Sequence, residues 1–346
     1  MKTRGVLVAL ALAAAFLPIR PETVERWYST GIYPRLQGVI TPATNLVPVA
    51  LLDIASAAAL VFTVAAFVRR ARAAGARRAA VALAGGVISG AAVVYLLFVA
   101  LWGLNYRRVP LEQKLDYDRA RVTREAAATL ANAAVDSANA GYAAAHARGA
   151  DDAALARAFA GAQQAIGARR TAVPGVPKHS LLTLYFRRAA IDGMTDPLFL
   201  EIILNRDVLA FERPVVLAHE WGHLAGYADE SEANFIAWLT CVRSDDAVAH
   251  YSGWVAAYQH AAAVLPREMR ATLHPLDPGP REDLRAMYAR YARSTPVVRN
   301  AARGVYDSYL RANRVAEGIA SYDLVLRLML GTRFDDGWAP RMRAPQ

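Results

Sequence analysis

Two histidines and a glutamate with helical spacing are the residues best suited to chemistry. His219, Glu220 and His223 follow the order His-Glu-x-x-His inside the apolar run 215–224. Residues four apart on a helix project from the same face, so both imidazoles can bind one metal ion. Glu220 then lies beside the metal, where its carboxylate can take a proton from metal-bound water. The pattern therefore predicts a zinc site of the hydrolytic type.

A third ligand is needed, because catalytic zinc usually has three protein ligands and keeps a fourth position for water. Asp229 lies six residues after His223 and completes a His-Glu-x-x-His-x-x-Gly-x-x-Asp pattern, with Gly226 at the turn. Glu230 instead begins a second predicted helix, 230–243, and helix periodicity favours it as the ligand. Asp229 stays open as the alternative ligand or as the cap of that helix.

The second predicted helix carries small and polar side chains on the face of the predicted ligand. Ala233 and Ala237 are small enough to let it approach the metal-binding helix closely. Asn234 is predicted to accept a hydrogen bond from the second ring nitrogen of His219 or His223, which would fix the tautomer of that histidine. The two helices together predict a compact site.

A hydrolytic site also needs a donor that stabilises the developing oxyanion. Tyr251 and Tyr322 are the candidates in this sequence, with His250 as a further one. A packing role is the alternative for each tyrosine, because a phenol ring is large and mostly apolar.

The amino-acid composition limits which other kinds of site and partner this chain can have. Cys241 is the only cysteine, so an internal disulfide and a cysteine-based zinc site are both excluded. Hydrophobic residues make up 55% of the chain, which indicates a membrane portion. The net charge of +10 comes mostly from scattered arginines without a concentrated basic tract, so we expect no nucleic-acid partner.

Three apolar segments occupy the N-terminal part of the chain. They are residues 5–19, 46–68 and 79–104. The second and third are long enough to span a bilayer, and the first has the length of a signal anchor. Residues 20–44 contain three prolines and several aromatic residues, which predicts an interfacial segment interrupted by proline. We therefore expect a membrane domain with three transmembrane helices over residues 1–104.

Positive charge is concentrated on one side of these segments. Five arginines between residues 69 and 78 separate the second segment from the third, and Lys2 and Arg4 precede the first. The positive-inside rule places this side in the cytoplasm, so the third segment leads outward. Residues 105–346 are then expected to form an extracytoplasmic domain.

The rest of the chain is predicted to be mainly helical. Alanine-rich and periodic stretches predict helices at 122–148, 152–168, 245–265, 281–293, 296–313 and 317–330. Leu198 to Leu204 is the best strand candidate. A strand at the edge of a sheet there could receive an extended peptide, with a purely structural strand as the alternative. The expected fold class is mainly α, with a zincin-like domain and a small sheet after the membrane helices.

The Glu-x-x-Ala-Asn sequence at 230–234 resembles the gluzincin pattern of membrane metallopeptidases, whose second helix usually reads Glu-x-x-Ala-Asp. Most of the chain resembles a bacterial family, domain of unknown function 3810, with three N-terminal membrane helices and an inferred zinc-peptidase domain. The resemblance rests on Trp102-Gly103-Leu104-Asn105-Tyr106, His219-Glu220-Trp221-Gly222-His223, Glu230-Ser231-Glu232-Ala233-Asn234, Tyr251-Ser252-Gly253 and Gly318-Ile319-Ala320-Ser321-Tyr322. It implies His219, His223 and Glu230 as zinc ligands and Glu220 as the base.

These features predict a membrane-anchored zinc metalloendopeptidase on the outer face of the bacterial inner membrane. It would lie in the lipid bilayer, act on peptides or membrane-protein segments, and use Glu220 to pass a proton from zinc-bound water to the leaving amine. The alternative is a non-catalytic membrane sensor or scaffold with a structural metal site. The presence of Glu220 favours the enzyme, because a structural site needs no base. The sequence specifies no oligomeric state.

Overall fold

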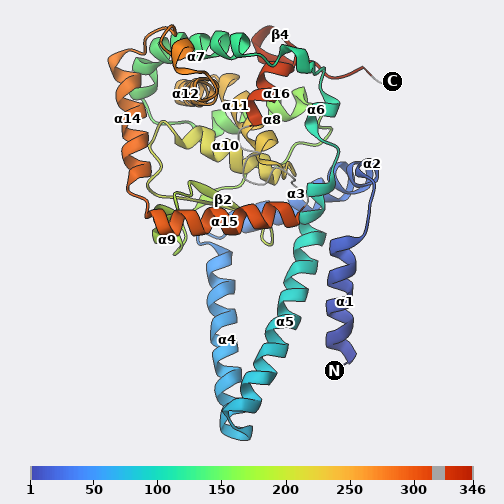
Figure 1. Cartoon of the computed structure of the whole chain (residues 1–346). Coiled ribbons are helices and arrows are strands. Elements are labelled where there is room, and N and C mark those ends of the chain that lie inside the picture. Colours follow the sequence, from blue (N-terminus) through green and yellow to red (C-terminus); the bar gives the residue numbers. More distant parts are fainter. Residues whose placement is uncertain (1, 314–323, 345–346) are drawn as a thin grey trace.

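The longest apolar segments form two helices that extend away from the rest of the molecule (Figure 1). The computed structural model describes residues 2–313 and 324–344. α4 (Leu51–Ala74) and α5 (Ala76–Leu101) form an antiparallel hairpin that turns at Gly75. Gly75 has a φ of +85°, a conformation that glycine adopts without a steric penalty. Apart from α1, which lies beside the hairpin, the other helices and the strands form a body at the open end of this hairpin (Figure 1).

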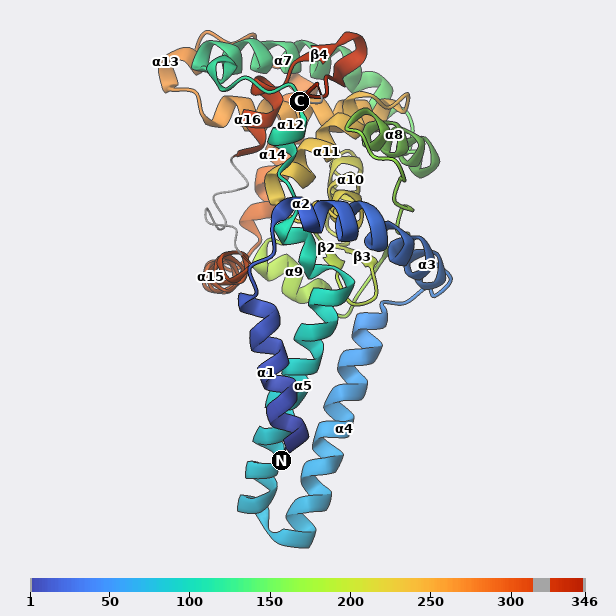
Figure 2. The same cartoon turned by 90° about the vertical axis from the view of Figure 1, so that its right-hand side faces the viewer.

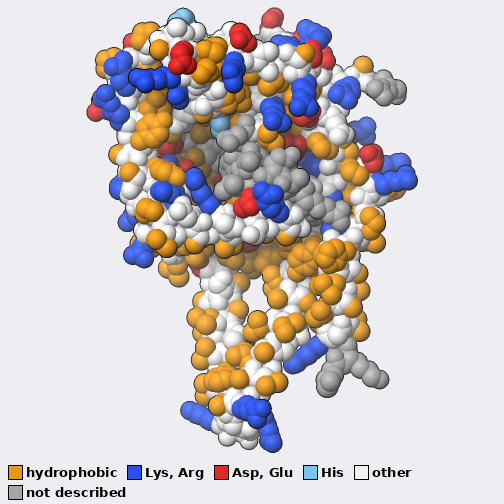
Figure 3. Space-filling view, in the orientation of Figure 1, with side chains coloured by type: hydrophobic (Ala, Val, Ile, Leu, Met, Phe, Trp, Pro, Cys, Tyr) orange, Lys and Arg blue, Asp and Glu red, His pale blue; other side chains and the backbone are white. Residues whose placement is uncertain are grey.

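α4 and α5 are long and apolar enough to cross a membrane. α1 (Lys2–Phe16) packs beside α5 and has 15 residues, a length of about 22 Å against a hydrocarbon core of about 30 Å. It joins the helical segment Pro21–Asn45 through a bend of 107°, so a third span exists only if this bent pair is one span. Basic side chains cluster at the hairpin tip, far from the body (Figure 3).

The segment predicted to be interrupted by prolines is continuously helical instead. It consists of α2 (Pro21–Thr23), the π-helix η1 (Val24–Ile32) and α3 (Tyr33–Asn45). Pro34 lies in the first turn of α3, where its missing N–H removes no helical hydrogen bond, and Pro42 lies in the last turn. The predicted interruption was therefore wrong, because Pro34 is compatible with a first turn and α3 accommodates Pro42 inside it, close to its C-terminal end.

This N-terminal segment crosses the base of the body, where the stem helices begin (Figure 2). Its inner face is part of the protein core. Tyr33 is buried and donates a hydrogen bond to the Leu224 carbonyl at 2.8 Å, and Gln37 donates to the Val173 carbonyl at 2.7 Å. Its outer face leaves Trp27 exposed. The segment is therefore amphipathic and joins the stem to the body.

The body is mostly helical, as the sequence predicts. Its helices are η2 (Gly103–Arg107), α6 (Leu111–Lys114), η3 (Arg119–Arg121), α7 (Arg124–His146), α8 (Asp152–Ala165), α9 (Thr183–Ala189), α10 (Arg213–Leu224), α11 (Glu230–Val242), α12 (Ala247–Ala263), α13 (Arg267–Arg270), α14 (Pro278–Ala292), α15 (Pro296–Ala312), α16 (Val325–Gly331) and η5 (Asp336–Trp338). The first part of the helix predicted at 317–330 falls outside the described residues.

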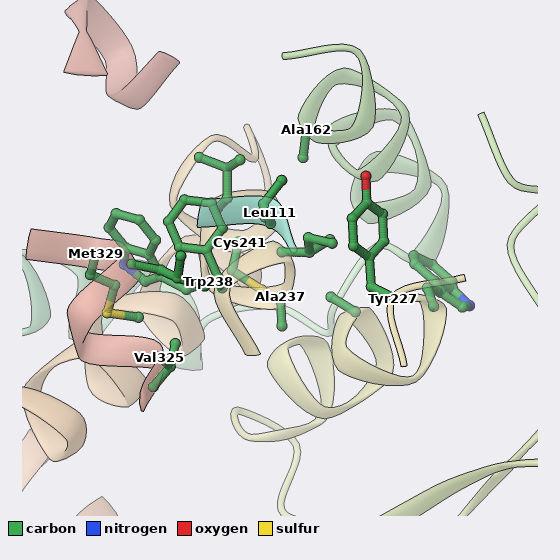
Figure 4. Close-up of a cluster of buried hydrophobic side chains, with 14 of the residues drawn as sticks. Leu111, Ala162, Tyr227, Ala237, Trp238, Cys241, Val325 and Met329 are labelled. Atoms are coloured by element: carbon green, nitrogen blue, oxygen red, sulfur yellow. The ribbon is translucent and has the colours of Figure 1, made fainter. Parts of the chain in front are cut away.

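α11 forms the centre of the body. All its residues except Asn234 are buried, as expected for a helix that is enclosed by other elements. It packs against α8, α10, α12 and α16. Trp238 and Cys241 of α11 pack with Leu111, Val325 and Met329 in the apolar cluster that Figure 4 shows. The element that begins with Glu230 is therefore held rigidly.

A three-stranded sheet lies beside α10, with the order β1–β3–β2. β1 (Pro177–Lys178) is parallel to β3 (Glu201–Leu204), and β2 (Gly193–Asp196) is antiparallel to it. The predicted strand at 198–204 is thus confirmed only from residue 201, and it is central, so its edges are already paired. β2 occupies the outer position next to α10. A second, two-stranded sheet pairs β4 (Phe334–Asp335) with β5 (Ala339–Pro340).

The sheet also holds the start of α4. The Glu201 carboxylate accepts hydrogen bonds from the backbone N–H groups of Leu51 and Leu52, at 3.1 and 3.0 Å. These groups belong to the first turn of α4, where the helix itself supplies no acceptors. Lys178 completes a buried ion pair with Glu201 at 2.7 Å. One end of the apolar hairpin is therefore fixed to the body.

Candidate metal centre

α10 and α11 place the residues of the candidate site. α10 has Pro214 in its first turn and ends before Gly226, whose φ of +81° allows the tight turn toward α11. The two helices approach closely at Gly222, where an added Cβ would lie 3.2 Å from the Cα of Ala233. The contact with Ala233 therefore favours a residue without a side chain at 222, and the periodicity of the second helix did not reveal this partner.

Three potential ligand atoms converge between these helices. His219 Nε2 lies 3.1 Å from His223 Nε2 and 3.3 Å from Glu230 Oε2. His223 Nε2 lies 3.6 Å from the same oxygen. His223 and Glu230 are buried, and His219 is nearly so. The structure thus brings together the three residues predicted as ligands.

The spacing of these atoms fits a tetrahedral metal ion. Two ligand atoms at about 2.0–2.1 Å from a zinc ion, at tetrahedral angles, are about 3.3–3.4 Å apart. The three measured separations lie around this value. Glu230 Oε2 is also buried without a hydrogen-bond partner among the described residues. Two imidazoles and one carboxylate form a donor set that suits zinc, so this cluster could hold a metal ion.

The ring of His223 is oriented by the loop between the two helices. Its Nδ1 lies 2.8 Å from the backbone oxygen of Tyr227, so Nδ1 carries the proton and Nε2 is free to bind a metal. The predicted hydrogen bond to Asn234 is therefore wrong for His223. It is also absent for His219, whose Nδ1 is buried without a partner in the described part of the chain. For His223, the backbone carbonyl of Tyr227 accepts the hydrogen bond that was predicted to go to Asn234. Sequence patterns do not reveal such a backbone contact.

Asp229, the alternative ligand, lies outside the cluster. Its carboxylate caps α11 by accepting hydrogen bonds from the backbone N–H groups of Ser231 and Glu232, at 2.8 and 3.4 Å. A capping carboxylate satisfies helix donors that otherwise have no partner. The structure therefore gives Asp229 the capping role and places the next residue, Glu230, beside the histidines.

Glu220 lies in a confined position between α10 and β2. Thr195 Oγ1 is 2.8 Å from its Oε2, and Gly193 faces its Oε1, where an added Cβ would be only 2.6 Å away. Burial raises the pKa of Glu220, although His219 and His223 lower it in part. A carboxylate with a raised pKa is better suited to exchange protons near neutral pH.

The charges of the clustered side chains shift one another's pKa values. Burial favours the uncharged form of Glu230, but His223 and His219 outweigh it and hold its pKa well below the usual range. Burial likewise disfavours the charged form of His223, but Glu230 opposes it and raises the pKa of His223 to about 9. A buried carboxylate thus keeps its negative charge beside two imidazoles. A divalent cation would take the place of the histidine proton.

Tyr306 is a site residue that sequence reasoning missed. Its hydroxyl donates a hydrogen bond to Glu230 Oε1, the oxygen that does not face the histidines. It belongs to α15, which begins 66 residues after Glu230 in the chain. No motif surrounds it, so only the regular spacing of Tyr306 and Tyr309 on one helix face could have drawn attention to it.

Two of the predicted oxyanion donors, Tyr251 and His250, are described by the structure, and neither joins this cluster. Tyr251 is fully buried, and its hydroxyl donates to the Asp283 carboxylate at 2.6 Å in a separate apolar cluster. Tyr251 therefore lies outside the ligand cluster, and its predicted catalytic role stays a prediction. Tyr322 lies outside the described residues. His250 faces Trp254, with its Nε2 3.2 Å from the indole nitrogen.

The comparison with protein families confirms the family that the sequence resembles. Residues 28–330 match the model of a family described as a protein of unknown function (DUF3810). The chain belongs to this family. The match covers both the apolar hairpin and the helices of the metal cluster. No curated protein and no solved structure matches the chain.

Proposed function

We propose that this chain is a membrane-anchored, zinc-dependent metalloendopeptidase of the outer face of the bacterial inner membrane. The observation that carries the proposal is the convergence of His219 Nε2, His223 Nε2 and Glu230 Oε2 at separations of 3.1 to 3.6 Å. A zinc ion held there would supply an activated water and polarise the carbonyl of the substrate. A structural site would need no further acid or base beside it.

Each side chain around the cluster supports hydrolysis in a definite way. Glu220 would accept a proton on its carboxylate and return it to the leaving amine, and its raised pKa suits both transfers. Thr195 holds that carboxylate through its hydroxyl. Tyr306 holds the ligand Glu230, and its hydroxyl is the described phenol best placed to stabilise negative charge beside the site.

β2 supports a peptide as the substrate. It pairs with β3 on one side only, and it carries Gly193 and Thr195, both in contact with Glu220. An extended peptide that added to this strand would run past the carboxylate. The edge expected at residues 198–204 is thus replaced by another strand that lies closer to the reacting groups.

The membrane placement rests on the apolar hairpin and on the position of its charges. The arginines between residues 69 and 78 lie at the end of α4 and α5 that is remote from the body. With this end in the cytoplasm, the body lies outside, and α1 with Pro21–Asn45 serves as a third, bent membrane segment. A reporter fused after Gln346 tests this topology, and a cytoplasmic signal would contradict it.

Metal analysis of the purified full-length chain tests the site. We expect stoichiometric zinc in the wild type and in Asp229→Asn, whereas His223→Ala and Glu230→Gln should weaken zinc binding by about 100-fold or more. Retention of zinc in Glu230→Gln together with its loss in Asp229→Asn would overturn the ligand assignment.

Activity is tested separately with Glu220→Gln, which keeps the shape of the side chain. Zinc should stay bound while peptide hydrolysis falls by about 100-fold or more. A peptidase activity that survives this substitution would refute the mechanism. A zinc-loaded chain that hydrolyses no peptide in a broad library would instead favour the sensor or scaffold.

A further inference from the structure

A large polar cavity lies beside the loop that follows α10. Its volume is about 870 Å³. Its walls come from η1 and α3, from the segment after α8, and from the loop at the end of α10. The side chains of His219, His223 and Glu230 are not among those that line it. The cavity is therefore a separate feature of the fold.

The lining of this cavity has a strong excess of positive charge. Six basic residues and one acidic residue face it, and they are Arg26, Arg108, Lys114, Arg169, Arg170, Arg343 and Glu25. The single carboxylate is already engaged by two cations. Arg108 binds both oxygens of Glu25 at 3.0 Å, and Lys114 Nζ lies 2.5 Å from Oε1. Glu25 cannot neutralise the remaining arginines as well.

Four arginines that line the cavity are thus left, and all four are exposed to solvent. Within residues 2–313 and 324–344, no carboxylate forms an ion pair with Arg26, Arg169, Arg170 or Arg343. Four like charges that surround one concave space repel one another and attract anions. Guanidinium groups bind phosphate and carboxylate through paired N–H donors, and a phosphate monoester carries more charge, about −1.5 to −2 at pH 7.

We propose that this cavity binds a phosphate-bearing ligand. The ligand is larger than inorganic phosphate, because a cavity of about 870 Å³ is in the range that accommodates a whole small molecule or a lipid headgroup. Two sources share this chemistry. One is the headgroup of an anionic phospholipid, which the position of η1 and α3 at the junction of stem and body would bring near (Figure 2). The other is a soluble phosphate ester.

The cavity adjoins the loop that orients a metal-cluster histidine. Arg108 donates a hydrogen bond to the Gly226 carbonyl at 2.8 Å and lies 4.1 Å above the ring of Tyr227. The backbone oxygen of Tyr227 in turn faces His223 Nδ1. The binding site does not depend on the proposed hydrolysis, but it shares this loop with the candidate metal centre.

The test compares three full-length proteins. They are the wild type, Arg169→Gln/Arg170→Gln in the cavity, and the matched control Arg119→Gln/Arg121→Gln, whose two exposed arginines lie outside the cavity. In detergent, titration calorimetry with glycerol phosphate measures the soluble source. We expect the cavity variant to bind about tenfold or more weakly than the other two proteins. Phosphate bound at the metal centre would contribute equally to all three.

Lipid nanodiscs measure the other source. Melting temperatures are compared in phosphatidylcholine alone and in phosphatidylcholine mixed with phosphatidylglycerol. A rise with the anionic lipid that is lost only in Arg169→Gln/Arg170→Gln assigns the headgroup as the ligand. Binding of glycerol phosphate without such a rise assigns a soluble ester. If the cavity variant equals the control in both experiments, the proposal is wrong, whatever the metal assays show.

Discussion

Gly193 sets the position of the Glu220 carboxylate. A methyl group at residue 193 would lie 2.6 Å from Glu220 Oε1, a distance that real contacts do not reach. The carboxylate is the far end of a flexible side chain, so it would move instead of the backbone. Thr195 would then lose its 2.8 Å hydrogen bond to Oε2. Gly193 is thus as important for the position of this carboxylate as Thr195, which binds it.

Gly193→Ala should therefore separate catalysis from metal binding. We expect peptide hydrolysis to fall by about 10- to 100-fold, because small displacements of a catalytic group are costly, while bound zinc stays unchanged. Kinetic assays together with metal analysis measure both quantities. Gly161→Ala is the control, since an added methyl group there meets nothing within 4 Å. Full activity in Gly193→Ala would show that Glu220 does not need its present position.

Tyr306→Phe tests the residue that completes the site from α15. Loss of the hydroxyl removes the hydrogen bond to Glu230 Oε1, so zinc affinity should fall by about 10- to 100-fold. If Tyr306 only positions the ligand, saturating zinc restores kcat. If it also stabilises the transition state, kcat stays low at saturating zinc. Tyr288→Phe, on an exposed tyrosine, is the control. Unchanged zinc affinity in Tyr306→Phe would contradict the positioning role, and an unchanged kcat would contradict the second role.

The short connection between α10 and α11 is the element on which the candidate site depends. Periodicity within each helix predicted which residues share a face, and Gly226 indicated a turn. Neither could predict that Tyr227 would offer its carbonyl to His223, because backbone hydrogen bonds depend on the path of the loop. The sequence left two roles open for Asp229, and the start of α11 gives it the capping role and excludes it from the cluster.

The sheet is the element that fixes the apolar hairpin, and its buried ion pair is open to test. Glu201→Gln leaves Lys178 buried without a negative partner and weakens the acceptor for the first turn of α4. We expect the free energy of unfolding to fall by about 3–5 kcal/mol. Thermal unfolding in detergent measures it, with the exposed Glu268→Gln as control. Equal melting temperatures would show that this pair does not stabilise the junction.

At the scale of the whole molecule, the stem and the body share one core. Tyr33 from α3 donates a hydrogen bond to the Leu224 carbonyl at 2.8 Å, at the end of the metal-binding helix. The Trp102 indole, just after α5, donates to the His223 carbonyl at 2.9 Å. The predicted domain limit at residue 104 would cut both contacts. That limit stays a prediction, but the site is supported from both sides of it.

A fragment that begins at residue 105 should consequently bind zinc much more weakly than the full chain. We expect a loss of about 10-fold or more, because the backbone that orients His223 is no longer held. The control lacks residues 2–16, since α1 packs mainly along α5 and leaves those two contacts intact. Metal titration compares the three proteins. Equal affinity in the fragment would show that the body alone forms the site.

The sequence by itself determined the features that depend on local spacing. Helical periodicity placed His219, His223 and Glu230 on facing helix surfaces, and apolar runs with an arginine-rich turn predicted the hairpin of α4 and α5. Only the tertiary structure decided what distant segments contribute. Tyr306 reaches Glu230 across 76 residues of chain, and Gly193 meets Glu220 from a strand. Such contacts depend on how whole elements pack, and packing leaves no regular spacing in the sequence from which it could be predicted.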